Sequence, residues 1–212
     1  MKNDKHAARG FTLVELIIAM AIGMVVLGAL YSLFSVQNQT FFLQEQIAEM
    51  QQNARSGMEI MLRDIRMAGY NPKRITPWIS GTEPGLTGAT ANSLSYVSDL
   101  NADGDTTAAS FNPKENITYD TYNDGGISFL GRTTNGVRQP VVKNIESMTL
   151  VYYDQTGNTL SIPLSLPAVR KIRVTITTKT ALPDSSYADT TYGDHYRRYS
   201  LTFDVTPRNL GL

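Results

Sequence analysis

The chain has 212 residues, its 19 Lys and Arg residues balance 19 Asp and Glu residues, and it contains no cysteine. A net charge of zero provides no bulk attraction for nucleic acid or anionic surfaces, so no nucleic-acid partner is expected. The lack of cysteine excludes disulfide bridges and thiolate metal sites. The length suits one domain of ordinary size together with an anchor.

The chain begins with a short basic leader, residues 1–10, which is followed by an apolar run over residues 11–36. About 20 mainly apolar residues cross a bilayer as a helix, so the run predicts a single membrane span. The positive leader is expected to stay in the cytoplasm, which places the rest of the chain on the far side. Glu15 is the only charged residue in the run. A carboxylate at membrane depth costs about 2.5–3.5 kcal/mol and therefore indicates a function that involves a partner.

Residues 9–15, Arg-Gly-Phe-Thr-Leu-Val-Glu, resemble the type IV prepilin signal, in which cleavage follows a glycine and exposes an aromatic or apolar residue. The resemblance implies that prepilin peptidase cuts between Gly10 and Phe11 and then methylates the new amino group of Phe11. It also implies that Glu15 pairs with the positive N-terminus of a neighbouring subunit in a bundle of N-terminal helices.

Two other interpretations of the N-terminus compete with this one. An ordinary secretory signal is cleaved after its apolar region, at a site with small residues. Here the best junction precedes the apolar run, so the span would be kept after processing. A plain uncleaved signal-anchor is the second rival, but it would not require Glu15.

The helical pattern continues beyond the apolar run, because a second set of apolar residues recurs every three or four positions. Its members are Leu43, Ile47, Met50, Ala54, Met58, Met61, Ile65 and Ala68. Gly69 and Pro72 provide a stop, since glycine accepts the left-handed cap conformation and proline cannot continue a helix. We therefore predict one long helix from Phe11 to Ala68, with a membrane half (residues 11–36) and an amphipathic half (residues 37–70).

From residue 71 to 212 the apolar period changes to two, which is typical of half-buried antiparallel strands. The clearest strands lie at residues 172–177 and 198–205, and shorter ones at 117–119 and 148–152. Asp124-Gly125, Asn135-Gly136 and Gly157-Asn158 provide turn residues that tolerate positive φ. The sequence thus predicts an α+β fold, in which the long N-terminal helix packs on an antiparallel β-sheet. We expect a long polar loop at about residues 75–116, another at 183–195, and no internal repeat.

The first polar loop contains the pattern of a calcium-binding loop. Oxygen-bearing side chains stand at alternate positions and are followed by glycine, as in the first half of an EF-hand. These residues are Asp99, Asn101, Asp103 and Asp105. The twelfth position, where a bidentate glutamate is expected, is occupied by Ser110, so Glu115 would have to close the site. The alternative is a solvated Asp/Asn/Gly turn without metal. Calcium is the only cofactor that the sequence suggests.

Four tyrosines, Tyr187, Tyr192, Tyr196 and Tyr199, cluster around the second polar loop. They could form an adhesive surface, but packing within the strands and the loop is the interpretation that we favour.

Beyond the signal, several stretches resemble PilW-type minor pilins, at residues 53–55, 64–72, 99–105, 115–119, 142–146 and 152–154. The resemblance implies a minor pilin that primes or caps a type IV pilus and supports assembly, adhesion or motility. Its partners would be prepilin peptidase, other major and minor pilins, the inner-membrane assembly platform and, before assembly, membrane lipid. It would cross the inner membrane once, with its globular region in the periplasm, and then reach the cell surface in the pilus. A J-type pseudopilin of type II secretion is the main alternative.

A signal-anchored periplasmic enzyme is a weaker alternative. The chain has only two histidines, His6 and His195, and no nucleophile, zinc, P-loop or dinucleotide motif. Asp103 and Asp105 could act as paired carboxylates, but their turn context argues against tuned acidity. We therefore expect no enzymatic activity.

Overall fold

The computed structural model describes residues 11–74, 84–106 and 115–210. The chain divides into two compact units, Met1–Glu45 and Gln46–Leu212, and we call the second unit the head. One continuous helix, α1 (Leu13–Arg66), runs through both units. The helix expected over Phe11–Ala68 is thus confirmed, with each end two residues shorter than predicted.

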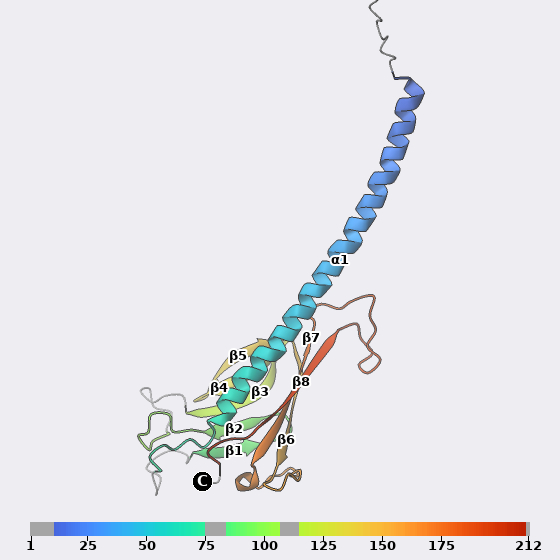
Figure 1. Ribbon diagram of the computed structural model, residues 1–212. Helices are drawn as coiled ribbons and strands as arrows, with labels where there is room; N and C mark the ends of the chain where they lie inside the picture. Colours follow the sequence, from blue (N-terminus) through green and yellow to red (C-terminus); the bar gives the residue numbers. More distant parts are fainter. Residues whose placement is uncertain (1–10, 75–83, 107–114, 211–212) are drawn as a thin grey trace, which may run out of the picture. The chain divides into compact units, whose positions relative to one another are not determined.

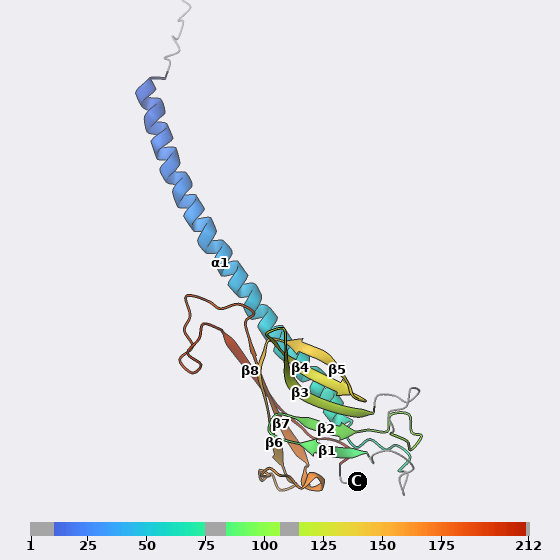
Figure 2. The same cartoon turned by 180° about the vertical axis from the view of Figure 1, so that it is seen from behind.

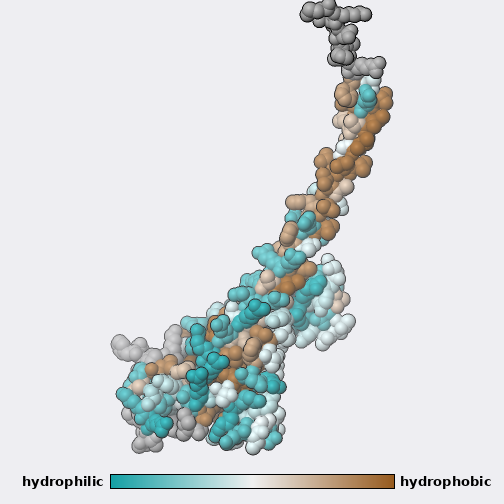
Figure 3. All heavy atoms as spheres, viewed as in Figure 1, coloured by the Kyte–Doolittle hydropathy of each residue, from teal (hydrophilic) through white to brown (hydrophobic). Residues whose placement is uncertain are grey.

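The N-terminal part of α1 keeps its apolar side chains on the outside. An 18-residue window of the helix is long and apolar enough to cross a membrane, and none of that window is buried inside the molecule. Figure 3 shows apolar residues gathered along this part of the helix, whereas the visible face of the head is mainly polar. A helix that is apolar all round and unburied needs either lipid or other apolar helices around it.

The head contains two antiparallel sheets, so the predicted α+β class is confirmed and the single expected sheet becomes two. The five-stranded sheet has the order β1-β2-β3-β4-β5 and the three-stranded sheet has the order β6-β7-β8. The first sheet is made of β1 (Gly85–Ala89), β2 (Leu94–Val97), β3 (Asn116–Asp124), β4 (Ile127–Thr134) and β5 (Val137–Lys143). The second is made of β6 (Ile145–Tyr153), β7 (Lys171–Lys179) and β8 (Arg198–Val205), with the short 3-10 helix η1 (Leu166–Ala168) between β6 and β7.

The second half of α1 packs against both sheets of the head (Figures 1 and 2). Six members of the predicted apolar stripe are buried, namely Met50, Ala54, Met58, Met61, Ile65 and Ala68. Gly57 lies close to both sheets, since a Cβ placed there would lie 2.9 Å from Val142 Cγ2 on β5 and 3.8 Å from Ile176 Cδ1 on β7. The predicted stop is also present, because Gly69 adopts a φ of 77° just after the helix.

Strands β1 and β2 lie inside the segment that was expected to be a loop. β2 is only four residues long, and three of them, Leu94, Tyr96 and Val97, are fully buried. A run this short and this buried does not alternate between apolar and polar residues, so a period of two cannot reveal it. β1 has the sequence Gly-Leu-Thr-Gly-Ala, whose glycines oppose strand formation locally. Pairing with β2 in the folded head stabilises it instead.

Candidate functional site

The prepilin junction can be described on one side only. Gly10 lies outside the described residues, whereas Phe11 is described and is 89% exposed. Glu15 stands in the first turn of α1. Its carboxylate Oε2 accepts a hydrogen bond from the Thr12 main-chain N–H and another from the Thr12 hydroxyl, each at 2.9 Å. In return, the Glu15 N–H donates to Thr12 Oγ1 at 3.2 Å.

These reciprocal bonds form a capping box, in which the cap residue and the residue three positions later satisfy each other's exposed N–H groups. The box gives the Glu15 carboxylate two donors from its own chain, which lowers the cost of holding it among apolar side chains. Thr12 is a partner of Glu15 that the sequence analysis did not single out. The sequence could have revealed this contact, because a Thr that is followed three positions later by Glu, just before an apolar run, is the pattern of a capping box.

The acidic loop is less exposed than its composition suggests, because Asp99 is completely buried. Its Oδ1 accepts a hydrogen bond from the Ala102 N–H at 2.7 Å, and its Oδ2 accepts one from the Gly104 N–H at 3.2 Å. Farther along, Asp103 Oδ2 accepts from Asn101 Nδ2 at 2.7 Å and Asp103 Oδ1 accepts from the Asp105 N–H at 2.8 Å. The loop is therefore an ordered turn built around Asp99, with Asn101 and Asp103 at its surface.

Glu115 reaches the same loop from the segment just before β3. It is completely buried, and its Oε1 accepts hydrogen bonds from the Leu100 N–H at 2.9 Å and from the Asn101 N–H at 3.4 Å. Its Oε2 is buried and has no hydrogen-bond partner within residues 11–74, 84–106 and 115–210. Burial raises the pKa of Glu115, and the negative charges of Asp99 and Asp103 raise it further, although the two N–H donors act in the opposite direction. The structure thus places Glu115 beside the loop.

In the described ranges, no group of three or more His, Cys, Asp or Glu side chains is arranged so that it could hold a metal by itself. Any cation at this loop would therefore need neutral oxygen ligands as well. Asp103 and Asp105, considered above as paired carboxylates, are instead joined by the bond from the Asp105 N–H to the Asp103 side chain. His195 is exposed to solvent in part, and its Nδ1 contacts the Tyr187 carbonyl oxygen.

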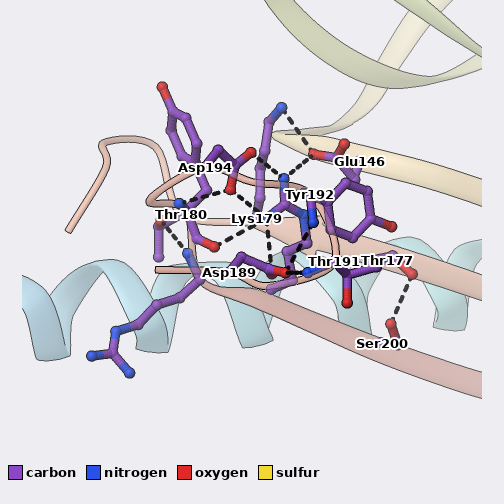
Figure 4. Close-up of polar contacts among 12 residues, drawn as sticks. Glu146, Thr177, Lys179, Thr180, Asp189, Thr191, Tyr192, Asp194 and Ser200 are labelled. Atoms are coloured by element: carbon purple, nitrogen blue, oxygen red, sulfur yellow. Dashed lines mark hydrogen bonds and ion pairs between the residues drawn. The ribbon is translucent and has the colours of Figure 1, made fainter. Parts of the chain in front are cut away.

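The second polar loop is held by a network of charges centred on Arg198 at the start of β8. Arg198 Nη2 lies 2.6 Å from Asp194 Oδ2, and Arg198 Nη1 lies 3.1 Å from Asp189 Oδ2. Glu146 on β6 lies 3.5 Å from Arg198 and 2.9 Å from Lys179 Nζ. Figure 4 shows these carboxylates converging from the loop and from β6. The Arg198 guanidinium lowers the pKa of Asp194 to about 2.

A short repeat underlies this network, contrary to the expectation of no internal repeat. Asp-Ser-Ser-Tyr at residues 184–187 is followed by Asp-Thr-Thr-Tyr at residues 189–192. In each copy the Asp Oδ1 accepts the N–H of the residue two positions later, at 3.0 Å in the first and 2.8 Å in the second. Each Asp also forms an ion pair with one of two adjacent arginines, Arg197 in the first copy and Arg198 in the second.

The tyrosines of the loop pack against the same cations. The Arg197 guanidinium lies 4.7 Å from the Tyr187 ring centroid, and the Arg198 guanidinium lies 3.7 Å from the Tyr192 ring centroid. Lys179 Nζ lies 5.3 Å from the ring centroid of Tyr196. These contacts support the packing interpretation for three of the four tyrosines, although Tyr192 is still 51% exposed.

Comparison with known proteins adds information on the N-terminus. Residues 5–31 match the family described as the prokaryotic N-terminal methylation motif. A comparison with curated proteins gives no match. Among solved structures, the chain is similar to a type IV-like pilin from Thermus thermophilus, with 10% sequence identity and a TM-score of 0.43, over 80% of this chain and 98% of that one. The matched motif lies at the start of the long helix α1, whose second half packs on the antiparallel sheets of the head.

Proposed function

We propose that this chain is a minor pilin of a type IV pilus. Prepilin peptidase cuts it between Gly10 and Phe11 and methylates the Phe11 amino group. The exposed apolar part of α1 holds the subunit in the inner membrane, with the head in the periplasm, and then joins the bundle of helices in the filament. The observation that carries the proposal is Glu15, a lone carboxylate within the matched motif on an unburied apolar helix.

The proposed partner of Glu15 is the methylated amine of Phe11 in a neighbouring subunit. Two unit charges 4 Å apart attract each other by about 4 kcal/mol at an effective dielectric constant of 20. Placing a carboxylate at membrane depth costs about 2.5–3.5 kcal/mol, so the pairing can offset that cost. It also sets the axial position of one helix relative to the next. The capping box with Thr12 serves the subunit before it assembles, when no such amine is near.

Mass spectrometry of the protein from piliated cells tests the processing step. The expected N-terminus is N-methylated Phe11, and an intact leader in such cells would contradict the proposal. A prepilin motif directs a peptidase to act on the chain, so the proposal assigns no chemistry of its own to the protein.

A second experiment separates a pilus subunit from a secretion pseudopilin, since both carry this signal. Pili sheared from wild-type cells are probed with an antibody to the head. A minor pilin is expected in the sheared fraction at low abundance relative to the major subunit. Retention of the protein in the cell envelope, together with loss of protein secretion on its deletion, would favour the pseudopilin instead.

A further inference from the structure

We propose that the loop Asp99–Asp105, together with Glu115, binds a calcium ion. The starting point is the Glu115 carboxylate, which is completely buried and has one oxygen, Oε2, without a hydrogen-bond partner among the described residues. A buried polar atom without a partner is costly, and its presence in a native structure points to an ion or a water molecule. The other oxygen of Glu115 accepts the N–H groups of Leu100 and Asn101, which directs the carboxylate at the loop.

The charge around Glu115 favours a cation. Asp99 is also completely buried, and Asp103 lies four positions farther along. Throughout the described part of the chain, no Lys or Arg forms an ion pair with Asp99, Asp103 or Glu115. Buried carboxylates are normally paired with a cation or coordinate a metal. Among the described residues, these two fully buried carboxylates therefore have no basic partner, and a bound cation would supply the missing positive charge.

The loop holds its first ligand as a calcium loop does. Asp99 takes the first position, and its Oδ2 accepts the N–H of Gly104 at the sixth position, where Gly104 has a φ of 78°. Calcium loops need glycine at this sixth position to make a sharp turn. Asn101 and Asp103 then stand at the third and fifth positions, with the main-chain carbonyl of Asp105 at the seventh. Calcium accepts six to eight oxygen ligands in flexible geometry, so amide and carbonyl oxygens complete what the carboxylates begin.

Glu115 replaces the glutamate that an EF-hand carries at its twelfth position. It lies just before β3 of the five-stranded sheet, so a strand rather than a helix positions the closing ligand. Asn101 Nδ2 donates to Asp103 Oδ2 and thereby holds the two surface ligands together. Binding turns the Asn101 amide so that its Oδ1, instead of its Nδ2, meets the ion.

The proposal is tested on the full-length protein in detergent micelles, by calorimetric titration with calcium chloride and by thermal unfolding in calcium chloride, magnesium chloride or EDTA. The test variant is Glu115→Gln. The control is Asp154→Asn, which changes a carboxylate in another Asx turn, where Asp154 Oδ1 accepts the N–H groups of Thr156 and Asn158.

Calcium at a hundredfold excess over its dissociation constant is expected to raise the melting temperature of the wild type by about 5–10 °C. Glu115→Gln is expected to weaken calcium binding at least tenfold and to remove most of this rise, whereas Asp154→Asn retains both. In EDTA, Glu115→Gln melts no lower than the wild type, because it removes a buried charge. The wild type should thus melt higher than Glu115→Gln in calcium but not in EDTA. A residue that only supports the fold would lower the melting temperature under both conditions when it is replaced.

Three results would overturn the proposal. They are no calcium-dependent heat or melting shift in the wild type, equal shifts with magnesium and calcium, and unchanged calcium binding by Glu115→Gln. If Glu115→Gln fails to fold, the exposed Asp103→Asn replaces it and is expected to lose at least tenfold in affinity. The outcome does not depend on whether the protein is a pilin, because processing and filament incorporation play no part in it.

Discussion

Asp64 on α1 forms an ion pair with Arg132 on β4, with Asp64 Oδ2 2.7 Å from Arg132 Nε. The same oxygen accepts the Tyr119 hydroxyl at 2.7 Å, so one carboxylate joins the helix to two adjacent strands of the five-stranded sheet. The side chains of Arg132 and Asp64 are only 22% and 17% exposed. Burial and the charge of Asp64 raise the pKa of Tyr119, so its hydroxyl remains a donor at neutral pH.

Asp64→Asn should therefore lower the free energy of unfolding of the head by about 2–4 kcal/mol, because it leaves the Arg132 guanidinium largely buried without its counter-charge. Urea unfolding in micelles, followed by circular dichroism, measures the loss. The double variant Asp64→Asn/Arg132→Met removes both charges and should recover a large part of it. The single variant Arg132→Met completes the comparison. If the losses of Asp64→Asn and Arg132→Met simply add in the double variant, the ion pair does not stabilise the packing of the helix on the sheet.

Gly57 should be intolerant of larger residues, since a side chain at that position would meet atoms of both sheets. A Cβ at residue 57 would meet Val142 Cγ2 at 2.9 Å and Leu130 Cδ2 at 3.3 Å. Gly57→Val is expected to lower the free energy of unfolding by about 1–3 kcal/mol through overpacking. Thermal unfolding checks this, with Val142→Ala as a second substitution that makes room and restores part of the loss. Gly28→Ala is the control, because a Cβ at residue 28 has no atom within 4 Å.

Much of the fold follows from local patterns in the sequence. The apolar stripe on residues 43–68 predicted the face of α1 that is buried, and alternation predicted strands β7 and β8. Gly69 predicted the end of the helix within three residues. These features succeed because each depends on neighbours in sequence, through the 3.6-residue period of the helix, the two-residue period of the strand and the φ that glycine allows.

The rest of the fold depends on contacts between residues far apart in the chain. Nothing local in Gly85–Ala89 specifies a strand, because its stability comes from pairing with β2. Asp99 is predicted to be a solvated turn residue, but in the structure it is completely buried and its N–H donates to the carbonyl of Tyr70, 29 positions earlier. Arg197 and Arg198 follow the loop repeat in sequence, but which Asp and which Tyr each of them contacts is fixed by the turns of the loop. The sequence therefore identified candidate ligands without showing which of them are buried.

The charge network of the second loop should control how well that loop is protected from solvent exchange. Arg198→Lys keeps the charge but loses the forked contact with Asp194 and the packing on Tyr192. Amide hydrogen exchange at Thr191 and Tyr196, whose N–H groups bond to Asp189 and Asp194, is expected to become faster. The exposed Arg208→Lys serves as the control. Unchanged exchange at both amides would show that the loop orders itself without Arg198.

The same network should make the protection depend on pH. The pKa of Asp194 is lowered to about 2, so the stabilisation by its ion pair is fully present above the ordinary Asp value of about 4. It is lost as the pH falls from there through about 2. In Arg198→Lys the pKa of Asp194 is expected to be lowered less, so the loss is smaller and is complete nearer pH 4. Identical acid profiles for both proteins would contradict the assignment of Arg198 as the main partner of Asp194.

Glu15→Ala should separate processing from assembly. The substitution leaves Gly10 and Phe11 unchanged, so cleavage and methylation are expected to proceed normally. It also removes the insertion cost of the carboxylate, so the subunit becomes more stable in lipid while it loses the attraction to a neighbour's amine. Incorporation into sheared pili should therefore fall strongly while the membrane-bound pool rises. Thr40→Ala is the control, because Thr40 is an exposed polar residue of α1 whose hydroxyl bonds only within the helix, to the Val36 carbonyl at 3.0 Å.

Thr12→Val extends the Glu15 experiment to the capping box. It removes the hydroxyl that donates to Glu15 Oε2 but keeps the Thr12 N–H donor at the same oxygen. Loss of a cap costs about 1 kcal/mol, so the membrane-bound pool should decrease modestly while the carboxylate remains available for pairing. Incorporation per membrane-bound subunit should then stay close to that of the wild type, in contrast to Glu15→Ala. If both variants lose incorporation to the same extent, Thr12 takes part in the contact between subunits, and the capping box acts in the filament as well as in the unassembled subunit.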